Sequence, residues 1–330
     1  MAAAQSRFGI GLIGVGRHGA RYLHHLVENL PEVRLAAVCR KRSNQEPIPG
    51  LPSGVRLYTD FHELIADSSV QAVVVVTPAS LCREICLNAV EAGKPLLVEK
   101  PLATTGEEAR AMVAAAERAK VLLMTAQTMR FDPILPYAKE QLGRIGAIRY
   151  GLLTSRIEMK ASAPVLPPQP RQRGTMIETG VHLLDMLRFI TGQEVVDARC
   201  DMAPHPAEAP ETMALAQLRT EGGIHCLVEV ARVGSGRVGR AEWVGADGQL
   251  SVDWVQRTVT CLQGVHQPEV QMIPQQPTIL ATLRAFLQAI DRNSPPPVTG
   301  LDGCRAVEIA DACYESASAG GTIVPVRRDR

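Results

Sequence analysis

The chain has 330 residues, more than one hydrophobic core usually supports, so its length favours two domains. Its 35 basic and 34 acidic side chains leave a net charge near +1. This balance lacks the strong positive field with which proteins bind DNA, RNA or anionic membranes. We therefore expect a small, neutral or modestly charged ligand, no nucleic acid and no membrane.

The sequence gives no sign of a membrane anchor or a metal centre. No stretch reaches the roughly 20 apolar residues that a membrane span needs, and the segment before Phe8 is too short and polar for a signal peptide. The eight cysteines are scattered, without Cys-x-x-Cys or Cys/His clusters at zinc spacing. Reduced, packed thiols of this kind are typical of a cytoplasmic protein.

From residue 8 to residue 125, short β-branched runs alternate with helical segments, as in successive β-α-β units. Continuous valine runs indicate a parallel sheet that is buried on both faces. The expected strands cover residues 8–13, 34–40, 72–77, 95–98 and 121–125. The expected helices cover residues 19–29, 81–92 and 105–119. This half of the chain is predicted to be a doubly wound α/β domain.

A glycine-rich turn follows the first expected strand. Its three glycines have the spacing that allows a tight bend, close approach of the backbone to a pyrophosphate, and close packing of helix on strand. The spacing alone is weak evidence, but here an apolar strand precedes the turn and a helical segment follows it. We expect a nucleotide site formed by Gly14, Gly16, Arg17, His18 and Gly19.

The second expected strand ends in Cys39-Arg40-Lys41-Arg42-Ser43, without the acidic residue that hydrogen-bonds the ribose in many NAD-binding units. Three cations and a hydroxyl suit the 2′-phosphate of NADP, and the arginine fork favours Arg40 and Arg42 over Lys41. The predicted cofactor is NADP or NAD, with NADP preferred. An exposed basic loop is the alternative interpretation.

Glu99-Lys100-Pro101 closes the apolar run of residues 95–98. It places a cation at the C-terminal edge of the parallel sheet, where open α/β sheets bind ligands. Lys100 could simply pair with Glu99, but adjacent strand residues point to opposite faces, which weakens that interpretation.

After Pro133 the strands become longer and partly alternating, which suits an antiparallel or mixed sheet with one face on helices. They are expected at residues 147–156, 195–200, 213–218, 224–232, 237–244 and 258–262. One strong helix is expected at residues 176–190, and two more at residues 277–291 and 302–319. The proline-dense segment 161–173 carries Arg171 and Arg173 and indicates either a loop over a site or a plain disordered loop.

The order of these segments resembles the glucose-fructose oxidoreductase, inositol dehydrogenase and MocA family (Gfo/Idh/MocA). The resemblance is carried by residues 14–19, 75–78, 92–102, 130–133 and 179–182. It implies a Rossmann domain over residues 1–126. It further implies a substrate-binding and oligomerisation α+β domain over residues 127–330, with a large open mixed or antiparallel sheet and C-terminal helices that can pack back on the first domain. Substrate and nicotinamide would meet between the two.

The resemblance also implies roles for single residues. Thr77, Pro78, Glu99 and Lys100 would lie on the cofactor side, while Lys100 and His182 would flank the reacting carbon. Two positions depart from the family pattern on the cofactor side, since Ala79 replaces an asparagine and Cys82 a histidine.

The chemistry follows from these residue types. His182 is suited to exchange the hydroxyl proton near neutral pH, and Lys100 to stabilise negative charge on the same oxygen. Glu178, where the family usually has aspartate, lies one helical turn from His182 and could orient the imidazole or bind a second hydroxyl. Asp185 is the competing acid. For His182 and Glu178 the alternatives are a packed histidine and a solvated carboxylate.

Four arginines have weaker assignments. Arg130 is expected to support the domain junction, while Arg156 and the arginines of segment 161–173 are candidate substrate contacts, with solvent-facing side chains as the alternative. Only 4% of residues are aromatic and two are tryptophan, so the composition gives little sign of a stacking platform for carbohydrate rings.

The leading hypothesis is an NAD(P)-dependent oxidoreductase that acts on a sugar, a polyol or a derivative. Two alternatives remain: a dinucleotide-binding sensor without turnover, or an enzyme that recycles its bound cofactor during elimination or glycoside cleavage. Open strands in the second half suggest a homodimer or homotetramer.

Overall fold

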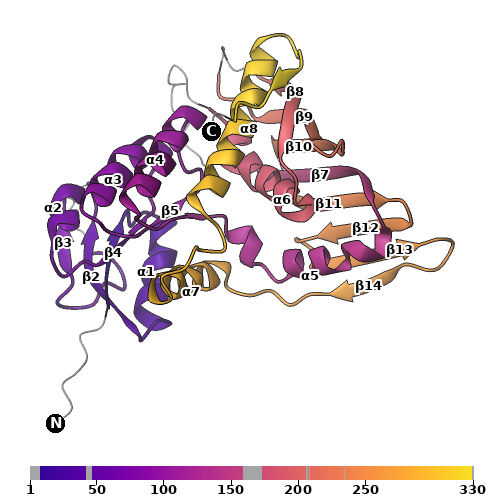
Figure 1. Ribbon diagram of the computed structural model, residues 1–330. Helices are drawn as coiled ribbons and strands as arrows, with labels where there is room; N and C mark the ends of the chain where they lie inside the picture. The colour runs from indigo at the N-terminus through magenta and orange to yellow at the C-terminus, as the bar shows by residue number, and fades with distance from the viewer. Residues whose placement is uncertain are drawn as a thin grey trace. The chain divides into compact units, whose positions relative to one another are not determined.

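The computed structural model describes residues 8–41, 47–158, 173–205, 207, 209–233 and 235–328. The chain divides into two compact units (Figure 1). The first comprises the residues up to Thr128 together with Pro277–Cys304, and the second comprises Met129–Gln276 together with the residues from Arg305 onward.

The first unit contains a six-stranded sheet in the order β3-β2-β1-β4-β5-β6. Every neighbouring pair of strands is parallel, as the sequence predicts. The strands are β1 (Phe8–Ile13), β2 (Val33–Cys39), β3 (Arg56–Tyr58), β4 (Ala72–Val75), β5 (Leu96–Glu99) and β6 (Leu123–Ala126). The strand order reverses between β1 and β4, and doubly wound sheets bind ligands at such a switch point.

Helices α1 (Gly19–Glu28), α2 (Phe61–Ala66), α3 (Ala79–Glu91) and α4 (Gly106–Ala119) connect these strands. Every residue of β4 is at most 1% exposed, which accounts for its continuous valine run. Thr105 caps α4 by accepting a hydrogen bond from the backbone N–H of Glu108. A distant helix, α7 (Thr278–Asp291), packs on α1 and β6 and completes this unit.

The second unit contains a nine-stranded mixed sheet in the order β14-β13-β12-β11-β7-β10-β9-β8-β15. Only β7 and β10 pair in parallel within the described part of the chain. The strands are β7 (Ile148–Glu158), β8 (Val195–Ala203), β9 (Met213–Thr220), β10 (His225–Val233), β11 (Val238–Gly245), β12 (Gly248–Asp253), β13 (Thr258–Gln263), β14 (Glu269–Met272) and β15 (Val324–Pro325).

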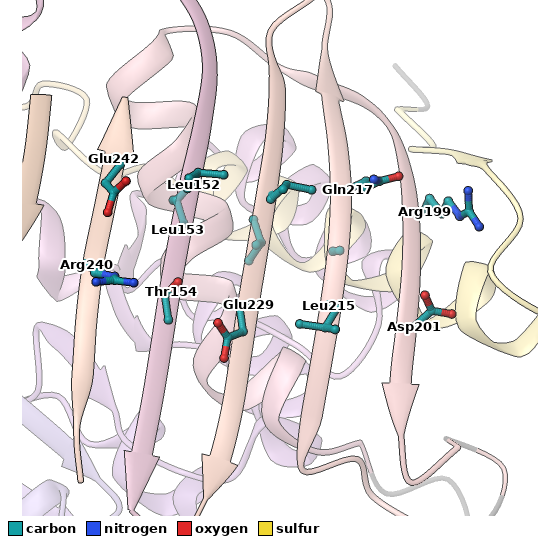
Figure 2. Close-up of a pocket in the computed structure, with 13 residues that line it drawn as sticks. Leu152, Leu153, Thr154, Arg199, Asp201, Leu215, Gln217, Glu229, Arg240 and Glu242 are labelled. Carbon is teal, nitrogen blue, oxygen red and sulfur yellow. The ribbon is translucent and has the colours of Figure 1, made fainter. Parts of the chain in front are cut away.

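One face of this sheet packs on helices and the other face is open. Helix α5 (Ile134–Gln141) contacts β12 and β13, and α6 (Val181–Thr191) contacts β7. The strands alternate accordingly: in β9, Ala214 and Ala216 are buried, whereas Leu215 between them is 46% exposed. Figure 2 shows the residues that line a hollow of about 580 Å³ on the open face.

The structure differs from the sequence expectations at several elements. Six short elements were not expected: strands β3, β12, β14 and β15, and helices α2 and α5. The helix expected at residues 176–190 has two parts, since Met176–Gly180 is a π-helix and only Val181–Thr191 is α-helical. Short 3₁₀ turns cover Thr128–Phe131 and Leu142–Ile145, and α8 spans Gly300–Ser318. None of the described helices is both long enough and apolar enough to cross a membrane.

Candidate active site

The turn between β1 and α1 holds its three glycines in different ways. Gly14 has a φ of +94°, and a Cβ there would lie 2.2 Å from the carbonyl oxygen of Val76. A Cβ at Gly19 would lie 2.0 Å from the carbonyl oxygen of Gly14. A Cβ at Gly16 would meet no atom of the described residues within 4 Å. The turn itself therefore requires Gly14 and Gly19, while Gly16 borders open space of the kind that a pyrophosphate occupies in such turns.

The same sheet edge brings the end of β4 beside this turn. The backbone N–H of Gly14 donates to the carbonyl of Cys39 (2.9 Å), and that of Val76 donates to the carbonyl of Ile13 (2.8 Å). Thr77 and Pro78 follow directly and precede α3. The cofactor-binding residues predicted in the glycine turn and the predicted Thr77 and Pro78 thus lie together at the switch point between β1 and β4.

Cys82 stands where the resemblance leads us to expect a histidine. It is fully buried, and its Sγ lies 3.7 Å from both the Pro78 carbonyl oxygen and Thr77 Oγ1. Burial raises the pKa of this thiol to about 11. Cys82 therefore packs against the Thr77–Pro78 turn as a neutral thiol.

Glu99, at the end of β5, is 6% exposed and bound on both carboxylate oxygens. Its Oε1 accepts from the Tyr22 hydroxyl (2.6 Å) and lies 2.7 Å from Nε2 of His18, while Oε2 accepts from the backbone N–H of Lys100 (2.9 Å). Burial and the neighbouring Glu99 charge raise the pKa of Tyr22 well above its usual value. Glu99 thus joins α1 to β5 and fixes the backbone at Lys100, whose side chain is half-buried.

The end of β2 carries both cations and nearby carboxylates. The backbone N–H of Arg40 donates to the Tyr58 carbonyl (3.1 Å), and Lys41 is exposed. Arg42 and Ser43 lie outside the described residues. Burial, followed by the charges of Asp60 and Glu63, raises the pKa of the Cys39 thiol to about 11, so two carboxylates of the α2 region lie near this strand end. The sequence did not indicate α2, so these carboxylates were not expected beside β2.

In the second unit, a cavity of about 450 Å³ lies beside His182. Its polar lining includes Ser155 and Thr179 as well as His182, together with Arg237 and Gln275. Met129, Ile157, Leu183, Val238 and Trp254 supply apolar surface. This volume and this mixture of many apolar and few polar groups are typical of small-molecule sites.

An ion pair fixes one wall of the cavity. Both terminal nitrogens of Arg257 bind the carboxylate of Asp132 at 2.7 Å, and the guanidinium also donates to the carbonyls of Ile273 and Pro274 (both 3.1 Å). The two side chains are each 15% exposed. All of these acceptors hold Arg257 in place, so it acts as a rigid part of the wall.

Glu178 lies in the π-helical segment and forms an ion pair with Arg232 of β10. The expected α-helical spacing between Glu178 and His182 is therefore wrong, because a π-helix has more residues per turn and rotates the carboxylate around the axis. Glu178 remains partly exposed, at 42%.

A carboxylate that the sequence did not single out holds the start of this segment. Glu211, 2% exposed, accepts from the backbone N–H groups of Gly174 (2.9 Å) and Met176 (2.7 Å) and from the Tyr314 hydroxyl (2.7 Å). Burial, followed by the charge of Glu211, raises the pKa of Tyr314. No local sequence signal identifies Glu211, because all three donors are distant in the chain.

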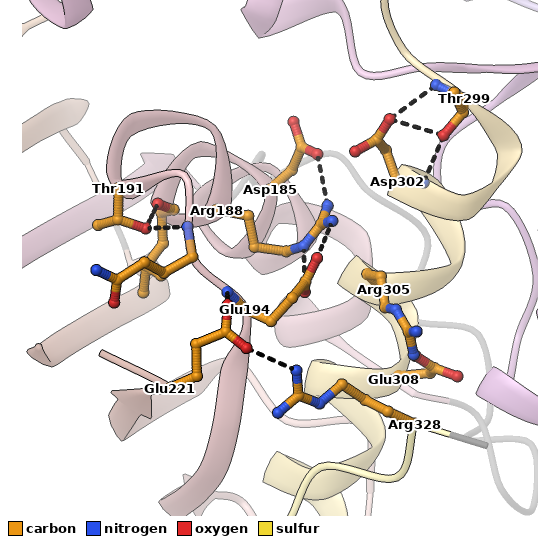
Figure 3. A network of polar contacts seen from close by, with 12 residues as sticks. Asp185, Arg188, Thr191, Glu194, Glu221, Thr299, Asp302, Arg305, Glu308 and Arg328 are labelled. Atoms are coloured by element: carbon orange, nitrogen blue, oxygen red, sulfur yellow. Dashed lines mark hydrogen bonds and ion pairs between the residues drawn. The ribbon is translucent and has the colours of Figure 1, made fainter. Parts of the chain in front are cut away.

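Asp185 is held by a buried ion pair. Arg130 donates to its two oxygens at 2.8 Å and 2.6 Å, and Asp185 is 2% exposed. In the network of Figure 3, Arg188 lies 3.9 Å from Asp185 and binds Glu194 at 2.6 Å. Burial opposes ionisation of Glu194, but Arg188 still lowers its pKa. Within the second unit, Arg130 and Asp185 thus anchor α6, the helix that carries His182.

Arg156 and Arg173 do not line the His182 cavity. Arg156 binds Glu229 (2.7 Å), which lines the open face of the sheet, whereas its neighbours Ser155 and Ile157 line the His182 cavity. The prediction that Arg156 contacts a substrate in that cavity is therefore wrong, because alternate residues of a strand project to opposite faces. Arg173 pairs with Asp311, and its guanidinium lies 4.5 Å from the centre of the Tyr314 ring. Arg171 lies outside the described residues.

Comparison with known proteins identifies the family of both parts of the chain. Residues 8–127 match the model of the oxidoreductase family with an NAD-binding Rossmann fold, and residues 139–326 match that of the family's C-terminal alpha/beta domain. The chain is 32% identical to inositol 2-dehydrogenase 2 of Saccharopolyspora erythraea, over 95% of this chain and 94% of that protein. It is 27% identical to D-apiose dehydrogenase of Paraburkholderia graminis, over 96% and 89% of the two chains.

Among solved structures, a probable dehydrogenase from Thermotoga maritima aligns with a TM-score of 0.79 and 26% identity, over 97% of this chain and 99% of that one. Its similarity extends through both units. Together with the matches to both family models, it shows that the chain belongs to the Gfo/Idh/MocA family and is an NAD-binding oxidoreductase of the class that acts on CH–OH groups.

Proposed function

We propose that the protein transfers a hydride between NADP or NAD and a secondary alcohol or ketone of a sugar, a polyol or a related derivative. The observation that carries this proposal is the cavity beside His182, where a titratable ring borders hydroxyl, guanidinium and amide side chains. Similarity to an inositol 2-dehydrogenase along nearly the whole chain supports the substrate class.

His182, Lys100 and Glu178 have separate roles in the proposed reaction. When bound, the nicotinamide supplies the hydride acceptor for oxidation and the hydride donor for reduction. His182 removes the hydroxyl proton during oxidation and returns it during reduction. Lys100 donates a hydrogen bond to the same oxygen and stabilises the charge that develops there. Glu178, held by Arg232 next to the cavity lining, accepts a hydrogen bond from a second substrate hydroxyl.

The experiment incubates the purified protein with NADP or NAD and a panel of polyols, free sugars, sugar acids and nucleotide sugars, and follows the nicotinamide absorbance. We expect turnover with one class. His182→Ala and Lys100→Met should each lower kcat by a factor of about 10² to 10⁴. Cofactor affinity, measured by calorimetry, should stay unchanged in His182→Ala. Intact cofactor binding without turnover in either direction would favour the sensor or the internally recycled cofactor.

For the cofactor, we propose that Arg40 makes the protein prefer NADP. It follows β2 directly, where the ribose of a Rossmann-bound dinucleotide is recognised, and Lys41 adds a second cation there. Arg40→Ala should lower kcat/KM for NADP by a factor of about 10 to 100, the usual value of a charge-assisted hydrogen bond, and leave that for NAD nearly unchanged. Lys41→Ala is the matched control with a smaller effect. Equal use of NAD and NADP by the wild type would contradict the proposal.

We also propose that the open face of the nine-stranded sheet pairs two copies of the chain. In Figure 2 its side chains project from neighbouring strands β11, β7, β10, β9 and β8. Leu215 and Leu227 are 46% and 49% exposed at its centre. Arg199, Asp201, Arg240 and Glu242 add charges of both signs around them. Mixed charge around an apolar centre is self-complementary, as an interface between identical surfaces requires.

The oligomer proposal is tested by light scattering after size-exclusion chromatography. The wild type should have twice or four times the mass of one chain, and Leu215→Glu with Leu227→Lys should shift it toward the monomer. Val265→Lys, at a fully exposed position, is the control. A monomeric wild type would contradict the proposal.

A further inference from the structure

The two tryptophans of the chain occupy different environments. Trp243 of β11 is fully buried and packs against Gly151, where a Cβ would lie 2.6 Å from its ring. Trp254, one residue past the end of β12, is half-buried and lines the cavity beside His182. A composition with two tryptophans gave little sign of a carbohydrate platform, but one of the two lies in the candidate substrate cavity.

The backbone around Trp254 is held firmly. Its N–H donates to the carbonyl of Gly239 (3.0 Å). In the turn that follows, Oδ1 of Asp253 accepts from the N–H groups of Val255 (2.9 Å) and Gln256 (2.7 Å). The indole therefore projects from a fixed turn.

Gly239 allows the indole to lie directly on strand β11. A Cβ at this position would lie 2.1 Å from Nε1 of Trp254 and 2.5 Å from its Cε2. Any other residue would displace the ring. Because Gly239 and Asp253 both fix its position, the aromatic surface is in place before any ligand binds, which lowers the entropic cost of binding.

The remainder of the cavity lining suits a neutral polyhydroxylated molecule. Ser155, Thr179 and His182 can hydrogen-bond hydroxyl groups. The two arginines of the lining both have acidic partners: Arg257 binds Asp132, and Arg237 binds Glu158 (2.8 Å). The cavity thus combines one apolar aromatic wall with hydroxyl-binding groups and charge-balanced ion pairs.

Ring-shaped polyols and sugars match this combination. A cyclitol or pyranose presents C–H groups on a flat face and hydroxyls around its rim, and such a face packs on an aromatic ring. An open-chain polyol has no fixed face and loses more rotational freedom on binding. We propose that Trp254 is a specificity-determining residue, whose indole is the platform that selects cyclic polyols and pyranoses over open-chain ones. This inference rests on the function proposed above and narrows its substrate class.

Trp254 provides its own binding signal, independent of turnover. In Trp243→Phe it is the single tryptophan of the chain. This protein is titrated with myo-inositol, glucose and galactose, and with the open-chain glucitol and galactitol. ADP-ribose or its 2′-phosphate is present, since neither can accept a hydride. We expect the emission of Trp254 to change with at least one cyclic compound and not with the open-chain ones. If Trp243→Phe fails to fold, the difference between the wild type and Trp254→Phe gives the same signal.

Kinetics of Trp254 variants give the second measurement. Trp254→Leu should raise KM for the cyclic substrate about tenfold, which corresponds to about 1.4 kcal/mol, and change that for an open-chain substrate by less than about twofold. Trp254→Phe, which keeps an aromatic face, should lie between Trp254→Leu and the wild type. Gly239→Ala should resemble Trp254→Leu, because it displaces the same ring.

The outcomes separate this inference from the proposed function. Turnover of a cyclic substrate with unchanged emission and an unchanged KM in Trp254→Leu overturns the platform and leaves the dehydrogenase. A cyclic compound that changes the emission but is never oxidised or reduced overturns the dehydrogenase and leaves the platform. Tighter binding of open-chain polyols, or no response to any cyclic compound, overturns the platform.

Discussion

At the cofactor edge, we expect a large effect from replacing a single atom of Glu99, one of its carboxylate oxygens. Its two oxygens accept from Tyr22 and Lys100 and contact His18 in a nearly closed site. Glu99→Gln keeps the shape but turns an amide donor toward other donors. We expect it to lower the free energy of unfolding by about 1 to 3 kcal/mol. We also expect it to lower kcat, because the backbone of Lys100 loses its anchor. Urea denaturation and steady-state rates measure the two effects.

Tyr22→Phe is the matched control for Glu99→Gln, because it removes one donor and leaves the carboxylate in place. We expect it to lower stability less than Glu99→Gln and to leave kcat near the wild-type value. If Glu99→Gln were as active and as stable as the wild type, Glu99 would not hold Lys100.

Asp185, the acid that competes with Glu178, belongs to a buried ion pair instead. Asp185→Asn leaves the Arg130 charge without its partner, and breaking buried pairs costs about 3 to 5 kcal/mol. We expect a lower unfolding midpoint in urea and a kcat/KM profile against pH with unchanged inflections. A shifted inflection would show instead that Asp185 titrates in the reaction. Arg188→Lys, in the adjacent pair with Glu194, is the control.

At the scale of elements, the π-helix that precedes α6 depends on Glu211. This carboxylate accepts hydrogen bonds from two backbone N–H groups at the start of the segment and from the Tyr314 hydroxyl. It therefore fixes the position of the backbone that carries Glu178 and leads to His182. Glu211→Gln should lower kcat about tenfold or more, as displaced catalytic groups do, with a much smaller change in cofactor affinity. Tyr314→Phe should have a weaker effect of the same kind. Unchanged kcat in Glu211→Gln would mean that the segment holds its position without this clamp.

The sequence predicted elements with continuous apolar runs better than elements with a mixed pattern. Strands β1 and β4 were placed to within two residues because their apolar runs are continuous. Strand β14 was missed because it is short, all four of its residues are exposed, and only Val270 and Met272 are apolar. The π-helix was missed because its hydrophobic spacing resembles that of the α-helix that follows it.

The site was predictable where chemistry depends on adjacent residues. The spacing of Gly14, Gly16 and Gly19 identified the turn, since its geometry is local. Glu211 and Trp254 were missed because their neighbours come from distant segments, and Arg156 was misplaced because one step along a strand changes the face. The catalytic roles of Lys100, His182 and Glu178 stay predictions that only kinetics can test.

At the scale of the whole molecule, buried weak acids occur in both units. Burial raises the pKa of the thiols of Cys39 and Cys82 to about 11, and of Cys86 and Cys226 to about 12. Burial likewise raises the pKa of the Tyr22 and Tyr314 hydroxyls. Each of these groups is held neutral in the folded chain beyond the pH at which it ionises when exposed.

The sign of the resulting pH dependence follows directly. In the unfolded chain, thiols ionise near pH 8.5 and tyrosines near pH 10. Above about pH 8.5 the unfolded state therefore binds fewer protons than the folded state, and stability falls as pH rises. Urea denaturation should give an unfolding free energy that decreases steadily from about pH 8.5 to 11. Cys82→Ala and Tyr22→Phe should each make this decrease shallower, since each removes one group that ionises only on unfolding. A free energy that stays level to pH 11 would mean that these thiols and hydroxyls ionise as easily in the folded chain as in the unfolded one.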